Sequence, residues 1–222
     1  IMQSISRSLI VAVAGLALCF GVATSASAAK SSYILATATP GGTFYPVGVG
    51  LASLTKVKLE PKSGISLSAI STAGSGENIK LLREKQAQFA ILQGVFGAWA
   101  WEGEGRMADV GPQEQLRSIT MLWSNVEHFV VRKKFVDTGT IDDMHKLEGG
   151  RFSIGRRNSG TEGSGTTLLG NLGFNLDNDF SLMYQGYEGS ANALQNGVIG
   201  GMNTPGGVPV SAVTRAAASM GD

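Results

Sequence analysis

Two short loops rich in glycine and hydroxyl side chains contain the residues best suited to hold a ligand. The first runs from Pro40 to Pro46 (PGGTFYP) and the second from Asn158 to Glu162 (NSGTE). Each is predicted to follow a strand and to open a helix, whose first backbone N–H groups are unpaired and partly positive. Glycine lets a ligand approach that backbone closely. Two such helix starts facing each other would bind an anion, especially a carboxylate.

Each loop also has a purely structural interpretation. Ser159-x-x-Glu162 fits a capping box, in which the serine and glutamate side chains satisfy the N–H groups of their own helix. Glu162 would then not contact a ligand. The hydroxyls of Thr43 and Thr161, and the repetition of one design in both halves of the chain, favour binding instead. The residues alone leave both interpretations open.

A third loop and a strand-end amide extend the candidate site. Ser75 and Asn78 open a helix after the second predicted strand, and Gln93 ends the third predicted strand. An amide side chain can donate and accept hydrogen bonds at once, which suits a polar ligand. The alternative for Gln93 is an ordinary polar residue at the end of a strand.

Enzyme chemistry finds little support in the residues. The chain contains only His128 and His145, and neither has the spacing to other ligands that is typical of a metal site. The glycine-rich run 160–167 lacks the G-x-S-x-G of a nucleophile elbow and the lysine of a phosphate loop. A hydrolase that uses Ser159 or Ser164 would lack a placed base. We therefore predict no catalytic residue, no metal and no cofactor.

Alternating strand and helix patterns place these loops at the carboxyl ends of strands. The predicted strands are Ser32–Ala38, Ile65–Ser71, Ala87–Gln93, Arg151–Gly155, Phe180–Tyr184 and Val198–Asn203. The predicted helices are Phe44–Leu54, one that opens at Ser75, Val95–Trp101, Asp142–Leu147, one that follows Asn158 and ends at Gly173, Ser190–Asn196 and Val210–Met220. This order predicts βαβ units and a mainly parallel sheet, in which ligands bind beyond the carboxyl ends of the strands.

Two segments depart from the simple alternation. The run 116–133 has no helical stripe and is interpreted as one or two extended strands that join a first domain to a second. The run 89–92 is entirely apolar, which predicts a strand buried on both faces.

The N-terminal segment predicts export. Arg7 precedes an apolar run from Leu9 to Val22 and then an Ala-x-Ala site ending at Ala28, which together are typical of a cleaved signal peptide. The apolar run is shorter than the roughly 20 residues of a spanning helix. Cys19 is the only cysteine, so the mature chain would contain no disulfide. The 18 basic and 17 acidic residues nearly balance, which argues against nucleic-acid binding and membrane-surface binding.

The motifs occur in an order that resembles the TAXI family, the solute receptors of tripartite ATP-independent periplasmic (TRAP) transporters. The motifs are Gly41–Pro46, Ser75–Asn78, Ala87–Gln93, Ser159–Glu162, Tyr184–Gly197 and Gly206–Pro209, and the resemblance spans Tyr33–Met220. It implies an α/β, two-lobed type II periplasmic-binding-protein fold. The signal peptide would occupy residues 1–28, lobe one 29–125 and lobe two 126–222. The resemblance also implies a C-terminal return to lobe one, for which this chain has no matching segment after residue 222.

The resemblance further implies a function. A monomeric periplasmic receptor, with no membrane insertion after cleavage, would capture a small carboxylate such as glutamate or a related dicarboxylate between its lobes. It would deliver this ligand to the membrane subunits of an ion-driven TRAP transporter. The implied ligand contacts are Gly42, Thr43, Phe44, Tyr45, Ser75, Asn78, Gln93, Ser159, Gly160, Thr161, Glu162 and Gly207. The alternative is a solute-sensing protein that presents its ligand to a membrane sensor.

Two positions differ from the family pattern. Gly200-Gly201 replaces an Asp-Ala pair, which weakens the prediction of a strand there. Arg156-Arg157 replaces small residues just before the second loop. An arginine at that point could pair with a ligand carboxylate, or the two could form a solvated surface pair.

Overall fold

The computed structural model describes residues 30–220, and the chain from Ser31 onward forms one compact unit. The predicted signal peptide and Cys19 lie outside the described residues. Among the residues described, no helix is both long enough and apolar enough to cross a bilayer.

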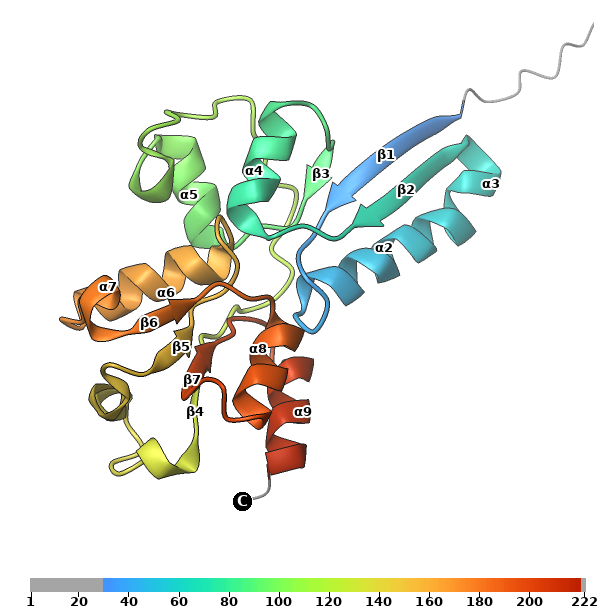
Figure 1. Cartoon of the computed structure of the whole chain (residues 1–222). Coiled ribbons are helices and arrows are strands. Elements are labelled where there is room, and N and C mark those ends of the chain that lie inside the picture. Colours follow the sequence, from blue (N-terminus) through green and yellow to red (C-terminus); the bar gives the residue numbers. More distant parts are fainter. Residues whose placement is uncertain (1–29, 221–222) are drawn as a thin grey trace, which may run out of the picture. The chain divides into compact units, whose positions relative to one another are not determined.

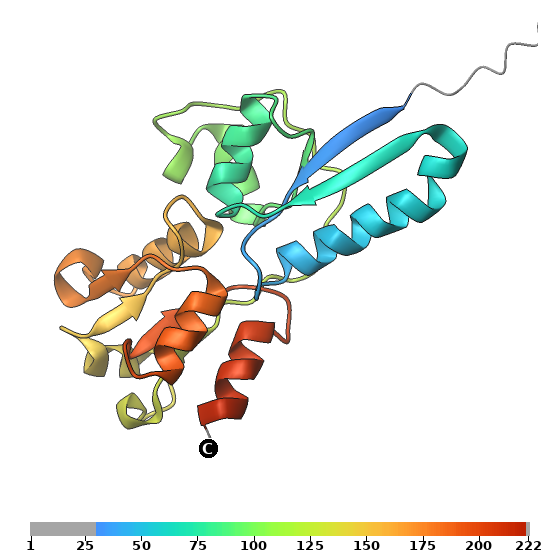
Figure 2. The same ribbon diagram turned by 45° about the vertical axis from the view of Figure 1, so that its right-hand side comes forward.

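A three-stranded parallel sheet forms the first half of the described chain, with strand order β2-β1-β3. Its strands are β1 (Ser31–Ala36), β2 (Ile65–Ile70) and β3 (Phe89–Ala90). Its helices are α2 (Phe44–Lys58), α3 (Glu60–Ser63), α4 (Ser75–Arg83) and α5 (Gly94–Glu102). β1 pairs with β2 along its whole length, and α2 packs along these two strands (Figures 1 and 2). The predicted parallel βαβ arrangement is confirmed here.

The prediction that the third strand is buried on both faces is wrong. β3 has only two residues and lies at the edge of the sheet, where Phe89 is 36% exposed and stacks edge-on against Tyr33. The apolar residues Ile91 and Leu92 follow the strand and pack into the interior instead. Ile91 is buried, and Leu92 packs against the apolar cluster of Ile79, Phe96, Ala100 and Met107 beneath α4 and α5.

A four-stranded sheet forms the second half, with order β4-β7-β5-β6. Its strands are β4 (Phe129–Val131), β5 (Arg151–Ser153), β6 (Ser181–Met183) and β7 (Gly201–Asn203). Its helices are α6 (Gly160–Asn171), α7 (Leu176–Asp179), α8 (Tyr187–Gln195) and α9 (Ser211–Met220). Among the described residues, 3-10 helices are η2 (Lys133–Phe135) and η3 (Ile141–Leu147) in this half and η1 (Gly105–Met107) in the first half. β5 runs parallel to both of its neighbours, and only β4 is antiparallel, to β7.

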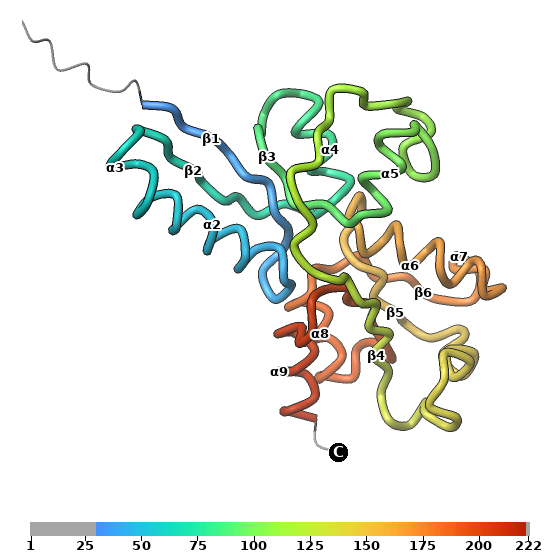
Figure 3. The backbone as a smooth tube through the Cα atoms, turned by 180° about the vertical axis from the view of Figure 1, so that it is seen from behind, coloured from blue at the N-terminus to red at the C-terminus, as the bar shows by residue number. Residues whose placement is uncertain are grey.

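The connection between the halves is mostly irregular. Figure 3 shows it in yellow-green, running from the side of α5 down to β4. Among the described residues, positions 117–125 make no backbone–backbone hydrogen bond. Pairing begins only where Val126 bridges Gly206 and β4 joins β7. The prediction of strands over the first part of 116–133 is therefore wrong, because no neighbouring strand pairs with it.

Two apolar clusters hold the second half together. The first contains Met144, Leu147, Phe152, Ile154, Leu169, Phe174, Leu176 and Phe180. The second contains Ala191, Ala193, Leu194, Ile199, Met202, Val210, Ala212 and Ala216, where α8 and α9 lie side by side (Figures 1 and 2). Gly173 ends α6 in the left-handed conformation that was predicted for it (φ +94°).

Close packing explains why residues 200 and 201 are both glycine. A Cβ added at Gly200 would lie 2.4 Å from Leu147 Cδ1, and one at Gly201 would lie 3.0 Å from the Val130 carbonyl oxygen. The strand forms in spite of the pair, because β7 is enclosed between β4 and β5. The close approach of its neighbours therefore requires glycine here.

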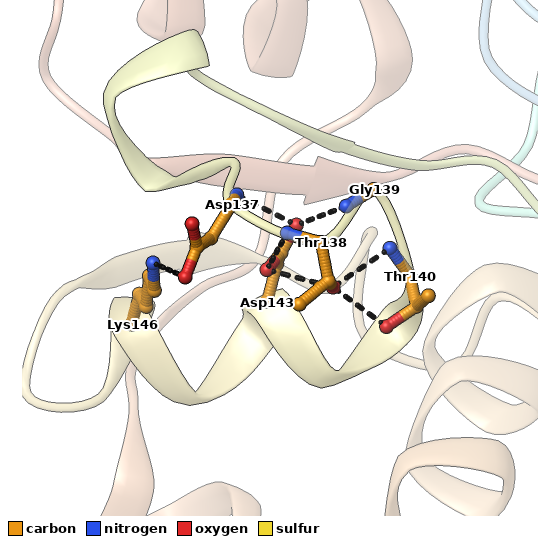
Figure 4. A network of polar contacts seen from close by, with 6 residues as sticks. All are labelled: Asp137, Thr138, Gly139, Thr140, Asp143 and Lys146. Carbon is orange, nitrogen blue, oxygen red and sulfur yellow. Dashed lines mark hydrogen bonds and ion pairs between the residues drawn. The ribbon is translucent and has the colours of Figure 1, made fainter.

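Asp143 organises the loop that precedes η3. Its carboxylate accepts hydrogen bonds from the backbone N–H groups of Asp137, Thr138 and Gly139 and from the Thr138 hydroxyl, at 2.9–3.0 Å (Figure 4). These bonds, that from the Thr138 N–H foremost, lower the pKa of Asp143 from its ordinary value of 3.8 to about 2. The ionised form is thus favoured in the folded protein.

We predict that Asp143→Asn lowers the melting temperature at pH 7, because the three N–H groups lose their charged acceptor. The folded-state pKa is depressed, so this stabilisation is complete above about pH 4 and is lost as the pH falls toward 2. The difference in Tm between wild type and variant should shrink over that range. Melting curves at several pH values test this, with Asp142→Asn at the exposed neighbouring position as control. A constant difference down to pH 2 would contradict the prediction.

Candidate functional site

Loops from both halves meet around one small pocket. Its volume is about 30 Å³. The lining residues are Ala38, Thr39, Gly42, Thr43, Phe44, Ala73, Gly74, Ser75, Gln93, Gly160, Thr161, Tyr187 and Pro205. Of these described residues, none is an aspartate, glutamate, lysine, arginine or histidine. The wall itself therefore presents only backbone groups and neutral side chains to a ligand.

Five helices begin at the wall of this pocket. α2 begins at Phe44, α4 at Ser75, α6 at Gly160 and α8 at Tyr187, and α5 begins directly after Gln93. Each helix has at least nine residues. Every helix start brings unpaired N–H groups and a partial positive charge. The wall is therefore suited to an anion although it contains no cationic side chain.

The two loops identified in the sequence do face each other. A Cβ added at Gly160 would lie 2.6 Å from Gln93 Oε1 and 2.8 Å from Ser75 Oγ. A Cβ added at Gly42 would lie 2.9 Å from the Tyr187 ring. Glycine at both positions therefore lets the first and second halves approach around the pocket.

The structure brings most of the predicted ligand contacts to the pocket wall. Those that line it are Gly42, Thr43, Phe44, Ser75, Gln93, Gly160 and Thr161. The others, which lie beside or behind these residues, are Tyr45, Asn78, Ser159, Glu162 and Gly207.

Asn78 is fully buried behind the wall. Its Nδ2 donates to the carbonyls of Thr37 (2.7 Å) and Ile91 (2.9 Å), and its Oδ1 accepts from the Thr72 hydroxyl (2.7 Å). The side chain thereby ties the ends of β1 and β3 to the start of α4. Asn78 therefore positions the loops that follow β1 and β3 and the loop that precedes α4.

Ser159 acts as the predicted cap, since its hydroxyl accepts from the Glu162 N–H at 3.0 Å. The second hydrogen bond of a capping box, from the Ser159 N–H to the Glu162 carboxylate, is not formed, however. Glu162 Oε2 accepts from the Asn158 N–H at 2.7 Å and pairs with Arg106 of η1 at 3.1 Å. Glu162 therefore joins the second half to the first.

Further contacts join the halves around the pocket. The Glu77 N–H donates to the Asn158 carbonyl at 3.0 Å, and the Gly207 N–H donates to Thr43 Oγ1 at 3.0 Å. A Cβ added at Gly163 would lie 2.4 Å from the Phe96 ring. The structure thus has its two halves in direct contact on several sides of the pocket.

Sequence reasoning missed Thr39, Tyr187 and Pro205. Tyr187 opens α8 after Gly186, which repeats the strand–glycine–helix pattern of the other loops, but the helix was predicted to begin only at Ser190. That repetition was the available signal. Thr39 and Pro205 carry no signal in the sequence, because only tertiary structure brings them to the wall.

The arginine pair before the second loop lies outside the pocket wall. Both side chains are exposed, and the guanidinium of Arg157 stacks over the Tyr184 ring at 3.7 Å. The interpretation of a surface pair fits this geometry, with a cation–π contact added.

Solved structures share the fold. A protein of Bordetella bronchiseptica RB50 matches with a TM-score of 0.55 at 18% identity, over 84% of this chain and 54% of that one. An ancestral arginine-binding protein bound to arginine matches with a TM-score of 0.53 at 11% identity, over 84% of this chain and 75% of that one. The alkanesulfonate-binding protein SsuA of Xanthomonas axonopodis pv. citri gives 0.49 at 14% identity, over 80% of this chain and 55% of that one.

The chain spans about half the length of the Bordetella and Xanthomonas proteins. The predicted α/β fold is confirmed, and the chain shares it with the Bordetella protein and with the ancestral arginine-binding protein. A sequence profile described as the NMT1-like family matches residues 35–222, which is most of the chain. The chain belongs to the NMT1-like family.

Proposed function

We propose that this protein is an extracytoplasmic solute-binding receptor that captures a small carboxylate, such as glutamate or a related dicarboxylate. The observation that carries the proposal is the convergence of five helix starts on one pocket without a charged side chain. The match to periplasmic-binding-protein folds and the absence of a placed base both favour binding over catalysis. The receptor would act in the periplasm after removal of residues 1–28.

The ligand enters when the two halves part. A pocket of about 30 Å³ has room for roughly one water molecule, so it must widen to admit a carboxylic acid. We place the division between lobes near residue 125, within the irregular connection at 117–125. Hinge closure of this kind buries the ligand between two lobes.

The pocket residues divide into two roles under this proposal. Backbone N–H groups at Phe44, Ser75 and Gly160 bind the carboxylate, with the Thr43 hydroxyl and the Gln93 amide beside them. The residues behind the wall, which are Tyr45, Asn78, Ser159, Glu162 and Gly207, position these loops.

Isothermal titration calorimetry of the full-length protein tests the proposal. The ligands are glutamate, glutamine, 2-oxoglutarate and C4 dicarboxylates, and we expect at least one to bind with a measurable Kd. A protein that binds no small anion would refute the proposal.

Delivery to an ion-driven TRAP transporter needs its own test. Uptake of the bound ligand into vesicles that contain the membrane subunits should require an ion gradient and no ATP. Uptake that depends on ATP would instead assign the receptor to an ATP-driven system.

The ion pair between Arg106 and Glu162 should stabilise the closed form. We predict that Arg106→Gln weakens ligand binding about twofold to fivefold, since partly exposed pairs contribute up to roughly 1 kcal/mol. Calorimetry with the best ligand measures this. Lys80→Gln is the matched control, because the Lys80–Glu84 pair lies within α4. Equal affinities for Arg106→Gln and wild type would show that the pair does not contribute to closure.

A further inference from the structure

A group of buried and half-buried polar side chains lies behind the pocket, in the second half of the chain. Five buried atoms in it make no hydrogen bond of ordinary length and angle within residues 30–220, although several of them face one another: Glu127 Oε2, Ser164 Oγ, Asn203 Oδ1, Asn203 Nδ2 and Thr204 Oγ1. Buried polar groups are nearly always partnered, so a cluster of exceptions requires an explanation. None of these residues lines the pocket.

The chain brings this cluster together from three elements. Glu127 lies between Val126, which bridges Gly206, and His128, whose carbonyl accepts from the Thr204 N–H at 3.0 Å. Asn203 ends β7 and packs so closely on α6 that a Cβ added at Gly165 would lie 2.6 Å from its Nδ2. A carboxyl group is thus held inside the second half, next to the helix that opens at the pocket.

The cluster adjoins the pocket wall through Thr161 and Tyr187. Thr161 lies one helical turn before Ser164 on α6, and its Oγ1 is 2.9 Å from the Tyr187 hydroxyl. That hydroxyl donates its only hydrogen to the Pro205 carbonyl. The Thr161 hydroxyl must therefore donate to Tyr187, which leaves its Oγ1 only lone pairs to offer a ligand.

Two ionisable groups determine the electrostatics of this wall, Tyr187 and Glu127. Burial raises the pKa of the Tyr187 hydroxyl, and the nearby charge of Glu127 adds to that rise. Burial raises the pKa of Glu127, which by itself favours the neutral carboxyl, while the polar groups of Ser164 and Asn203 oppose that rise and favour the carboxylate. Gln93 Oε1 is a further buried acceptor that has no partner among the described residues. One side of the pocket thus combines acceptor atoms with the carboxyl group of Glu127 behind them.

We propose that Glu127 is a specificity-determining residue, whose carboxylate behind Thr161 and Tyr187 favours ligands with a positively charged, hydrogen-bond-donating group over ligands that are anionic throughout. The helix starts of the first half would hold the carboxylate of such a ligand. Its donor group would face Thr161. This inference rests on the proposed function and adds to it the selection between two kinds of carboxylate.

The test compares L-glutamate with 2-oxoglutarate, which share a carbon skeleton and both carboxylates but differ in the ammonium group. Calorimetry on the wild-type protein should give tighter binding of glutamate. In Glu127→Gln the ratio of the two Kd values should fall about tenfold, because charges inside a protein interact through a dielectric constant well below that of water. Glu104→Gln removes an equal charge at an exposed position and should leave the ratio unchanged.

The outcomes separate the two proposals. A wild-type protein that prefers 2-oxoglutarate, or a folded Glu127→Gln variant with an unchanged ratio, would overturn this inference and leave the proposed function standing. An unchanged ratio would show that the cluster only holds ordered water. If Glu127→Gln does not fold, Thr161→Val provides the second test, because it removes the acceptor that faces the ligand and should lower the same ratio. Failure of every carboxylate to bind the wild type would refute the proposed function itself.

Discussion

Replacing Gly160 with valine is expected to weaken ligand binding by about 10- to 100-fold. The first added carbon would already lie 2.6 Å from Gln93 Oε1 and 2.8 Å from Ser75 Oγ, across the contact between the two halves. Overpacking of this kind costs about 1–3 kcal/mol, and each 1.4 kcal/mol is roughly tenfold in affinity. The cost arises only in the closed form, so the open form should remain folded. Calorimetry with the best ligand, together with a melting curve without ligand, measures both quantities.

Gly170→Val is the matched control for this prediction. Gly170 lies on the same helix, and a Cβ added there would meet no atom within 4 Å. Its ligand affinity should equal that of the wild type. If Gly160→Val binds ligand as tightly as Gly170→Val does, the pocket does not close between Gly160 and the Gln93–Ser75 wall.

Truncating Phe152 to alanine is expected to remove about 3–5 kcal/mol from the free energy of unfolding. The side chain is fully buried on β5 within the first apolar cluster of the second half, and its ring lies 5.6 Å from that of Phe180. Domains are stable by only about 5–15 kcal/mol, so this loss is a large share of the total. Denaturant titration followed by circular dichroism measures the change.

Phe89→Ala provides the comparison for Phe152→Ala. Phe89 is also on a strand, but it lies at the sheet edge and is 36% exposed, so its truncation should destabilise much less. Equal losses for the two variants would mean that the second half is not held by the cluster around Phe152.

The sequence predicted the positions of most helices and strands. The spacing of apolar residues and the glycines at the ends of elements are local signals, which can be read without knowing the tertiary structure. β1, α2, β2 and α4 begin within one residue of their predicted starts. It failed at residues 89–92 and 117–125, where apolar composition alone does not distinguish an edge strand or an irregular connection from a buried strand. The capping box between Ser159 and Glu162 was also only half correct, since Arg106 and Asn158 are the partners of the glutamate.

The sequence by itself determined where α2, α4 and α6 begin, because capping residues and glycines act within a few residues of one another. It therefore identified the loops at 40–46, 75–78 and 158–162 as the places where unpaired N–H groups would lie. Only the tertiary structure decided that these three helix starts meet those of α5 and α8 around one pocket, that Thr39, Tyr187 and Pro205 join its wall, and that Glu127 lies behind it. The physical reason is that these contacts join residues far apart in the chain, and their geometry depends on how two sheets and their helices pack.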